Sequence, residues 1–285
     1  SEPVEGSSAI IGAYNYFLKN IDPEKVDRNT IKSNVQFVCI DLTEGEDEQQ
    51  IFDTINSLGV RLTTAELLKN YFFNRENEQA FKDSWEDVFE PTAEKKSFWD
   101  QEVVTGRIKR TLIDLFFDAF LQIMVQDKAR CVTAEDKLYY SRTSNLFQSY
   151  KDFISRYCDG GKDEVLNAMN AYAAVFESTF DPTCCDRNVP PAPSTERMNV
   201  LIFGLKNSTL IPYVLYVRKS VESPDEQAKV FATLESYIVR RMLVRATTKN
   251  YNRLFTSLIL LAVAIAVELV VLSVIRVRTN KKAAE

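Results

Sequence analysis

The sequence contains no histidine among its 285 residues. An imidazole is the side chain that titrates near neutral pH and a common metal ligand, so its absence excludes whole classes of site. His-Asn-His nucleases, Ser-His-Asp and Cys-His nucleophile pairs, and histidine-ligated zinc sites are all ruled out for this chain. Any proton transfer that it performs must use another side chain.

Cysteine is scarce and shows no metal-binding pattern. The five cysteines include no C-x-x-C pair, and their odd number does not fit a disulfide framework. Free thiols suit a reducing compartment, which predicts a cytoplasmic location. The first eight residues are polar and acidic and lack the basic and apolar regions of a signal peptide. The cysteines are Cys39, Cys131, Cys158, Cys184 and Cys185.

Glycine is also rare, with eight residues against eighteen phenylalanines and twelve tyrosines. This balance favours packed helices over a turn-rich β fold, so the predicted fold class is mainly α, a multi-helix bundle. The chain is long enough for one large or two small domains. Its net charge of −5 argues against a generally cationic surface, so any contact with DNA must be local.

The stretch from residue 50 to residue 73 predicts two helices joined by a tight turn. Apolar residues recur at helical spacing over residues 51–58, and Gly59 can turn the chain at positive φ. Thr63 and Glu66 then form a T-x-x-E capping box, in which each side chain binds a free backbone N–H of the first turn. From spacing alone, this is a helical corner that packs a core.

The same stretch resembles the signature of the GmrSD-type type IV restriction enzyme family, in the later part of its ParB/sulfiredoxin-like N-terminal domain. The family pattern reads N-S-x-G-x-x-L-[ST]-x-x-[DE]-L-x-[KR]-N. A second block, residues 240–255, is similar to the helical region that precedes the family's nuclease domain, so the resemblance spans roughly residues 14–260. The residues on the pattern are Asn56, Gly59, Leu62, Thr63, Glu66, Leu67, Lys69 and Asn70.

The resemblance implies a place in phage defence. Complete family members are nucleotide-dependent restriction enzymes that act on modified foreign DNA, one domain binding the nucleotide with magnesium and a histidine-containing domain cutting. This chain lacks both histidine and the D-G-Q-Q-R motif that the family associates with nucleotide binding and hydrolysis. We therefore expect a fragment or truncated member that links the nucleotide-binding and nuclease parts and does not cut alone. DNA and a nuclease domain or subunit are the implied partners.

The pattern along the chain divides it into three parts. Residues 1–90 are expected to be the later part of the ParB-like domain, with a strand at residues 35–42 as the remnant of its α/β fold. A helical bundle follows over residues 91–253, and residues 254–285 form an apolar tail helix with a basic end. Hydrophobic spacing predicts helices at residues 103–125, 138–157, 165–180, 199–218 and 228–245.

Two charged segments are candidate binding surfaces. A basic stripe near the end of the bundle, interleaved with Tyr251 and Phe255, is typical of a phosphate-backbone contact. A solvated helix face, or a stripe that pairs with the acidic run at residues 41–48, would have the same pattern. The acidic run at residues 41–48 is interpreted as a solvated face favoured by the dipole of the next helix, so no metal site is predicted. The basic residues are Arg240, Arg241, Arg245, Lys249 and Arg253.

The apolar tail allows two interpretations. Residues Leu254 to Ile275 carry one formal charge, Glu268, and as a helix would span roughly 33 Å, enough for a bilayer core. A membrane helix would make the protein a non-enzymatic helical adaptor anchored at this end. The family resemblance implies a soluble helix instead, because relatives continue here into the nuclease domain. We predict the soluble arrangement, with the tail packed along the bundle.

Overall fold

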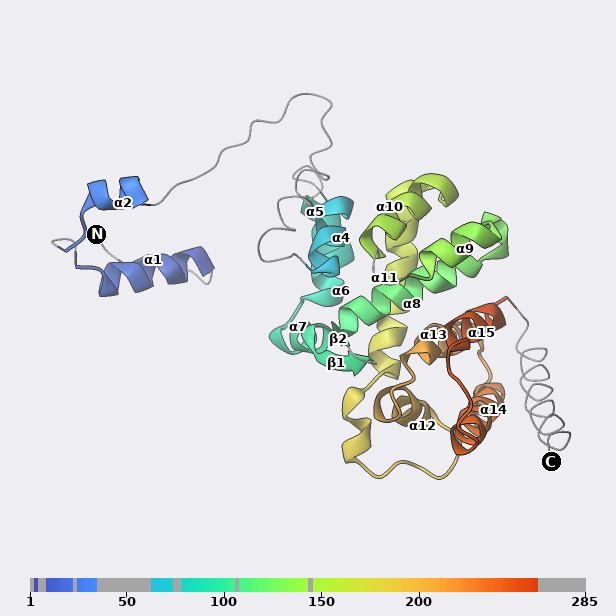
Figure 1. Ribbon diagram of the computed structural model, residues 1–285. Coiled ribbons are helices and arrows are strands. Elements are labelled where there is room, and N and C mark those ends of the chain that lie inside the picture. Colours follow the sequence, from blue (N-terminus) through green and yellow to red (C-terminus); the bar gives the residue numbers. More distant parts are fainter. Residues whose placement is uncertain are drawn as a thin grey trace, which may run out of the picture. The chain divides into compact units, whose positions relative to one another are not determined.

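The computed structural model describes residues 3–4, 9–22, 25–34, 63–73, 78–105, 108–142 and 146–260. The chain forms two compact units, Ser1–Arg61 and Leu62–Glu285 (Figure 1). The described elements are mainly helical, as the sequence predicted, with one small antiparallel hairpin. The strand expected at residues 35–42 and the helix expected at residues 51–58 lie outside the described residues.

The first unit contains α1, Ala9–Asn20, and α2, Arg28–Asn34. Asn15 on α1 exchanges hydrogen bonds with the backbone of Val4, at 3.0 and 2.8 Å. Asp27 precedes α2 and accepts hydrogen bonds from the Thr30 hydroxyl and from the backbone N–H of Asn29, which lower the pKa of this carboxyl. These contacts begin α2 in the way that an N-terminal aspartate usually does.

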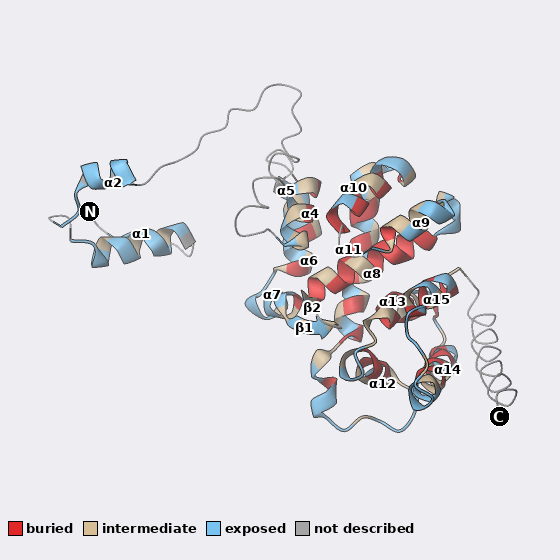
Figure 2. Ribbon diagram, in the orientation of Figure 1, coloured by how far each residue is buried: buried red, intermediate tan, exposed pale blue. Residues whose placement is uncertain are grey.

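Helix α8, Leu112–Gln126, lies at the centre of the second unit (Figure 1). Every residue of α8 is buried except Asp114 and Asp118, so this apolar helix is enclosed on nearly all sides (Figure 2). The helices that pack on it are α4, Thr64–Phe72; α7, Ala93–Asp100; α9, Ala134–Tyr140; α10, Leu146–Tyr157; α11, Gly161–Thr179; α13, Ile211–Ser220; and α15, Tyr251–Leu258.

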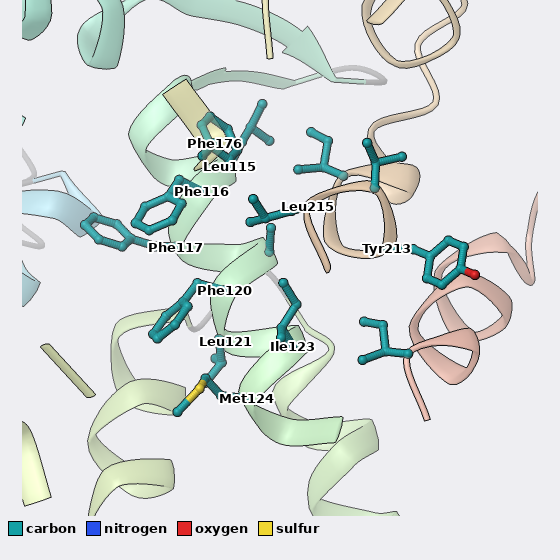
Figure 3. Packing of buried hydrophobic residues seen from close by; sticks show 14 of the residues in the cluster. Leu115, Phe116, Phe117, Phe120, Leu121, Ile123, Met124, Phe176, Tyr213 and Leu215 are labelled. Atoms are coloured by element: carbon teal, nitrogen blue, oxygen red, sulfur yellow. The ribbon is translucent and has the colours of Figure 1, made fainter. Parts of the chain in front are cut away.

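An aromatic cluster joins α8 to its neighbours. The Phe116 ring centroid is 5.4 Å from those of Trp99 on α7 and Phe176 on α11. Figure 3 shows Phe116, Phe117 and Phe120 along α8, with Phe176 beside them. Each buried phenylalanine contributes about 1.5–3 kcal/mol through its removal from water, and each favourable ring pair adds about 0.5–1.5 kcal/mol. This cluster is therefore a main source of the unit's stability.

The prediction of one helix over residues 103–125 is wrong in its first third. Residues Glu102–Thr105 form β1 and Ile108–Thr111 form β2, an antiparallel pair in which Val103 faces Arg110. Helix α8 begins only after Thr111, whose hydroxyl accepts the backbone N–H of Asp114 at 3.3 Å. The β-branched run before Gly106 favours strand, and the cap at Thr111 ends it. Arg110 fixes the hairpin to α8 through an ion pair with Asp118 at 3.1 Å.

Two other predicted helices are interrupted. The helix expected at residues 138–157 is divided between α9 and α10, which end and begin on either side of residues 141–145. The one expected at residues 199–218 is divided between α12, Thr195–Asn199, with a π-helical turn to Gly204, and α13. Lys206 adopts φ 57°, which a continuous helix does not permit. Pro212 then lies in the first turn of α13, where a missing N–H is tolerated.

Two further helical predictions are confirmed. Helix α11 covers the segment expected at residues 165–180, and α14, Pro224–Leu243, covers most of that expected at residues 228–245. A helical segment before Pro91 consists of α5, Glu78–Phe81, a π-helical turn and α6, Asp87–Phe89. Within the described ranges, no helix is both long enough and apolar enough to cross a membrane. Residues 261–285, which include Glu268, lie outside those ranges.

Candidate functional site

Helix α4 begins at the capping box that the sequence predicted. The Glu66 N–H donates to Thr63 Oγ1 at 3.2 Å, and the Thr63 N–H donates to Glu66 Oε2 at 2.8 Å. Leu68 and Phe72 are buried on the face of α4 that packs against α8 and α10. The capping box determines where α4 begins, and the spacing of its apolar residues determines which face is buried. Both are properties of the sequence of α4 itself.

The polar face of α4 lines a cleft of about 320 Å³. We call it the signature cleft, because three residues of the sequence signature lie along it. Residues from the π-helical turn at Lys82–Glu86, from α6 and the position after it, and from α7 complete its walls, and both tryptophans of the chain line it. Its lining residues include Thr63, Glu66, Lys69, Trp85, Glu90, Lys96, Trp99 and Asp100.

Lys69 makes an ion pair across this cleft. Its Nζ lies 2.9 Å from Glu90 Oε1, which also accepts the indole N–H of Trp85 at 3.1 Å. Burial of Glu90 alone would raise the pKa of its carboxyl, but the hydrogen bond and charge of Lys69 outweigh it and the pKa is lowered. Lys69 also lies 4.8 Å from the Phe81 ring centroid, a cation–π contact. Lys69 therefore has a structural role that its sequence position did not reveal.

A second ion pair lies on the α7 side of the cleft. Lys96 Nζ is 2.9 Å from Asp100 Oδ2, and this hydrogen bond raises the pKa of the Lys96 ammonium. The two ammonium groups that line the cleft are therefore each already paired with a carboxylate. A polyphosphate entering it would have to displace Glu90 from Lys69 and Asp100 from Lys96. Among the described residues, no group of three or more acidic or thiol side chains is placed to hold a metal ion.

The structure brings together only some of the signature residues. Thr63, Glu66 and Lys69 share the cleft, whereas Asn70 is exposed on α4. Asn56 and Gly59 lie outside the described residues, so a functional role for Asn56 stays a prediction. Sequence reasoning missed Glu90, Lys96 and Asp100. No local pattern marks them, because they reach Lys69 only through tertiary packing.

The basic stripe lies at the junction of α14 and α15. Four of its five residues are exposed and make no ion pair within the part of the chain that is described; we call them the basic face. Arg245, which follows α14, adopts φ 50° and its N–H donates to the carbonyl of Met242 at 2.9 Å, so it ends the helix. The basic face consists of Arg240, Arg245, Lys249 and Arg253.

Arg241 differs from the other four. Its guanidinium carbon lies 5.5 Å from the ring centroids of both Tyr237 and Tyr251, and its Nη2 donates to the Thr247 carbonyl at 2.6 Å. Tyr251 is buried and its ring also packs on Phe255 at 5.2 Å. Arg241 thus holds the turn between α14 and α15 in place, and its part in a phosphate contact stays a prediction. The interleaved aromatic residues are core side chains of this junction.

A family model matches the first part of the chain. Residues 5–73 match the family model described as the GmrSD restriction endonuclease, N-terminal domain. The match includes the signature residues Asn56 to Asn70 and all of α4, so the resemblance noted from the sequence is confirmed for this segment. The second block, at residues 240–255, lies outside it. No curated protein and no solved structure matches the chain.

Proposed function

We propose, from the GmrSD restriction endonuclease N-terminal segment at residues 5–73, that this chain is the helical body of a restriction protein that defends against foreign DNA. In this role it links a nucleotide-binding part to a nuclease part and contacts the phosphate backbone of DNA. The nucleotide, with magnesium, belongs to the complete system, and the chain does not cut DNA alone.

The observation that supports a linking role is the position of α4. This helix lies inside the family match and yet packs as part of the helical unit that begins at Leu62. The Lys162 ammonium fixes its end, donating to the Tyr71 carbonyl at 2.5 Å and lying 4.0 Å from the Tyr71 ring centroid. Lys69 and Glu90 fix its polar face. A displacement of α4 would therefore be passed to α8, α10 and α11.

The basic face supports the DNA contact. Its four side chains are cationic and exposed, and none is committed to an ion pair with a described residue. Neutralising a phosphate with such a side chain releases a condensed counterion, which is the main source of affinity in sequence-independent binding. The chain's net charge of −5 confines this attraction to the face itself.

A salt titration tests the DNA contact. Fluorescence anisotropy with a labelled duplex would compare the full chain with a triple variant, Arg245→Ala, Lys249→Ala and Arg253→Ala. The slope of log K against log salt should become shallower by about 0.9 for each lost phosphate contact, close to 2.7 in all. The matched control removes three exposed lysines elsewhere, Lys19, Lys128 and Lys229.

The control variant has the same net charge as the test variant. It should keep the slope of the unmodified chain, because none of its lysines belongs to the basic face. If the two triple variants lose affinity and slope equally, the attraction comes from overall charge and the proposed contact is wrong. If the unmodified chain binds no duplex at low salt, the DNA-binding part of the proposal is also wrong.

A further inference from the structure

Two adjacent cysteines lie side by side in a short 3₁₀ helix, Pro182–Asp186, which we call the cysteine turn. The Sγ atoms of Cys184 and Cys185 are 3.8 Å apart. In a strand, neighbouring side chains point to opposite faces, so adjacency in the sequence alone does not bring two sulfurs into contact. Here the backbone is turned, because the Cys184 N–H donates to the Asp181 carbonyl at 3.3 Å and the Arg187 N–H donates to the Cys184 carbonyl at 3.4 Å.

The two thiols differ in their access to solvent. Cys185 is exposed, whereas Cys184 is only 2% exposed. Burial raises the pKa of the Cys184 thiol to about 12, and the neighbouring Cys185 thiol adds to this rise. Because the thiolate is the reactive form of cysteine, a dissolved oxidant meets Cys185 first. Cys184 then reacts only with a group that is already in contact with it.

The Cys185 thiol also packs on the backbone of the next turn of the chain. Its Sγ lies 2.8 Å from the position that a Cβ atom at Gly204 would occupy. A glycine at this position therefore leaves room for the thiol. Gly204 ends the π-helical turn Val200–Gly204, against which the cysteine turn packs. The exposed thiol is thus seated between two packed turns while its sulfur stays beside that of Cys184.

The other two cysteines in the described ranges have no such neighbour. Cys131 is exposed, and its thiol donates to the Lys128 carbonyl at 3.7 Å. Cys158 is buried and accepts a hydrogen bond from Arg130 Nη1 at 3.2 Å. Within those ranges, neither contacts a second thiol. Cys131 is therefore an internal comparison, an exposed thiol without a partner.

We propose that Cys184 and Cys185 form a reversible oxidation site, at which hydrogen peroxide converts the two thiols into a disulfide between adjacent residues. The Cys185 thiolate attacks one peroxide oxygen, the O–O bond breaks, and a sulfenic acid and one water result. The Cys184 sulfur then attacks the Cys185 sulfur and the S–O bond breaks. The hydroxide leaves with the Cys184 proton as a second water. Two thiols are oxidised, and one peroxide is reduced to two waters.

The geometry favours both closure and reopening of this disulfide. The sulfurs start in contact at 3.8 Å and must approach to about 2.05 Å, so the second step is intramolecular and gains from proximity. Consecutive Cα atoms are about 3.8 Å apart, below the usual disulfide range of about 4.4–6.8 Å. The closed ring is therefore strained and readily reduced, as labile regulatory disulfides are. Such a bond forms transiently in a reducing compartment.

Peptide mapping of the full chain tests this proposal. The folded chain is treated with hydrogen peroxide, its remaining thiols are blocked with N-ethylmaleimide, and it is digested with trypsin. The peptide Asp163–Arg187 contains both cysteines of the pair and no other. After oxidation it should carry no maleimide and be lighter than the reduced peptide by about 2 Da, the mass of two hydrogens. Dithiothreitol before blocking should restore two maleimides.

Two variants serve as a matched pair of controls. Cys184→Ser keeps the exposed thiol without its partner, so it should lose the disulfide and accumulate a sulfenic acid at Cys185 that dimedone traps. Cys131→Ser removes the exposed thiol that has no partner, and it should form the disulfide as the unmodified chain does. If Cys184→Ser does not fold, Cys185→Ser, at an exposed position, should equally lose the disulfide.

Three outcomes overturn the proposal. The first is oxygen addition at Cys185 of the unmodified chain without the loss of two hydrogens. The second is a disulfide that joins two chains and not the adjacent residues. The third is an unchanged Asp163–Arg187 peptide under conditions that oxidise Cys131. This inference does not depend on the proposed restriction function.

Discussion

Removing the Lys69 ammonium tests the architecture of the signature cleft. In Lys69→Met, the Glu90 carboxylate keeps only the Trp85 N–H, which lies 3.1 Å from Glu90 Oε1. The Lys69 and Glu90 side chains are 32% and 30% exposed, so the pair lies between a surface pair worth 0–1 kcal/mol and a buried one whose rupture costs 3–5. We expect a loss of about 1–2 kcal/mol in the free energy of unfolding. A double-mutant cycle with Glu90→Gln should give a coupling of about 1 kcal/mol.

The assay is urea unfolding followed by tryptophan fluorescence. Both tryptophans of the chain, Trp85 and Trp99, line this cleft, so the signal reports on the element that is changed. Because the pKa of Glu90 is lowered in the folded state, the ion pair stabilises the fold above the unfolded pKa of about 4.3. Its contribution is lost as the pH falls through the folded pKa. A coupling near zero at pH 7, or one that persists unchanged at acid pH, would refute the reasoning.

Three other outcomes follow from the structure. Thr63→Ala should lower the free energy of unfolding by about 1 kcal/mol in the same assay, because the α4 cap is lost. Thr63→Ser should keep the stability of the unmodified chain, because its hydroxyl can make the same cap. An equal loss in both variants would contradict the role of the cap. Phe116→Ala should cost about 3–5 kcal/mol, while Tyr16→Ala, at a side chain that is 63% exposed, should cost under about 0.5; similar values would show that the aromatic cluster is not the core. The purified chain should not cleave plasmid DNA with magnesium, because it has no imidazole to activate water; metal-dependent nicking that co-purifies through several columns would contradict this.

The sequence predicted correctly those elements whose determining residues are close together along the chain. Thr63 and Glu66 are three residues apart, and their mutual hydrogen bonds form whenever a helix begins there, so α4 was predictable. The apolar periodicity of α8 was likewise a property of one helix. The hairpin before α8 was missed because its valines continue the apolar run, although Gly106 and the Thr111–Asp114 cap were visible signals.

The signature cleft could not be predicted because its lining residues are far apart along the chain. Lys69 meets Glu90 only after the chain has turned through α5 and α6. The basic stripe was recognisable, but the separate position of Arg241 depends on how Tyr237 and Tyr251 enclose it. Spacing gives the face of a helix on which a residue lies, whereas its partners depend on tertiary packing.

The position of α4 also bears on how such proteins exchange parts during evolution. A recombination joint at the end of the family match, after Phe73, would separate Leu68 and Phe72 from α8 and α10, the helices that bury them. The compact unit begins at Leu62, so a joint just before that residue keeps α4 with its packing partners. Chimaeras joined near residue 61 should therefore fold more often than those joined at residue 73. The N-terminal segment that can be exchanged then ends before the family match does.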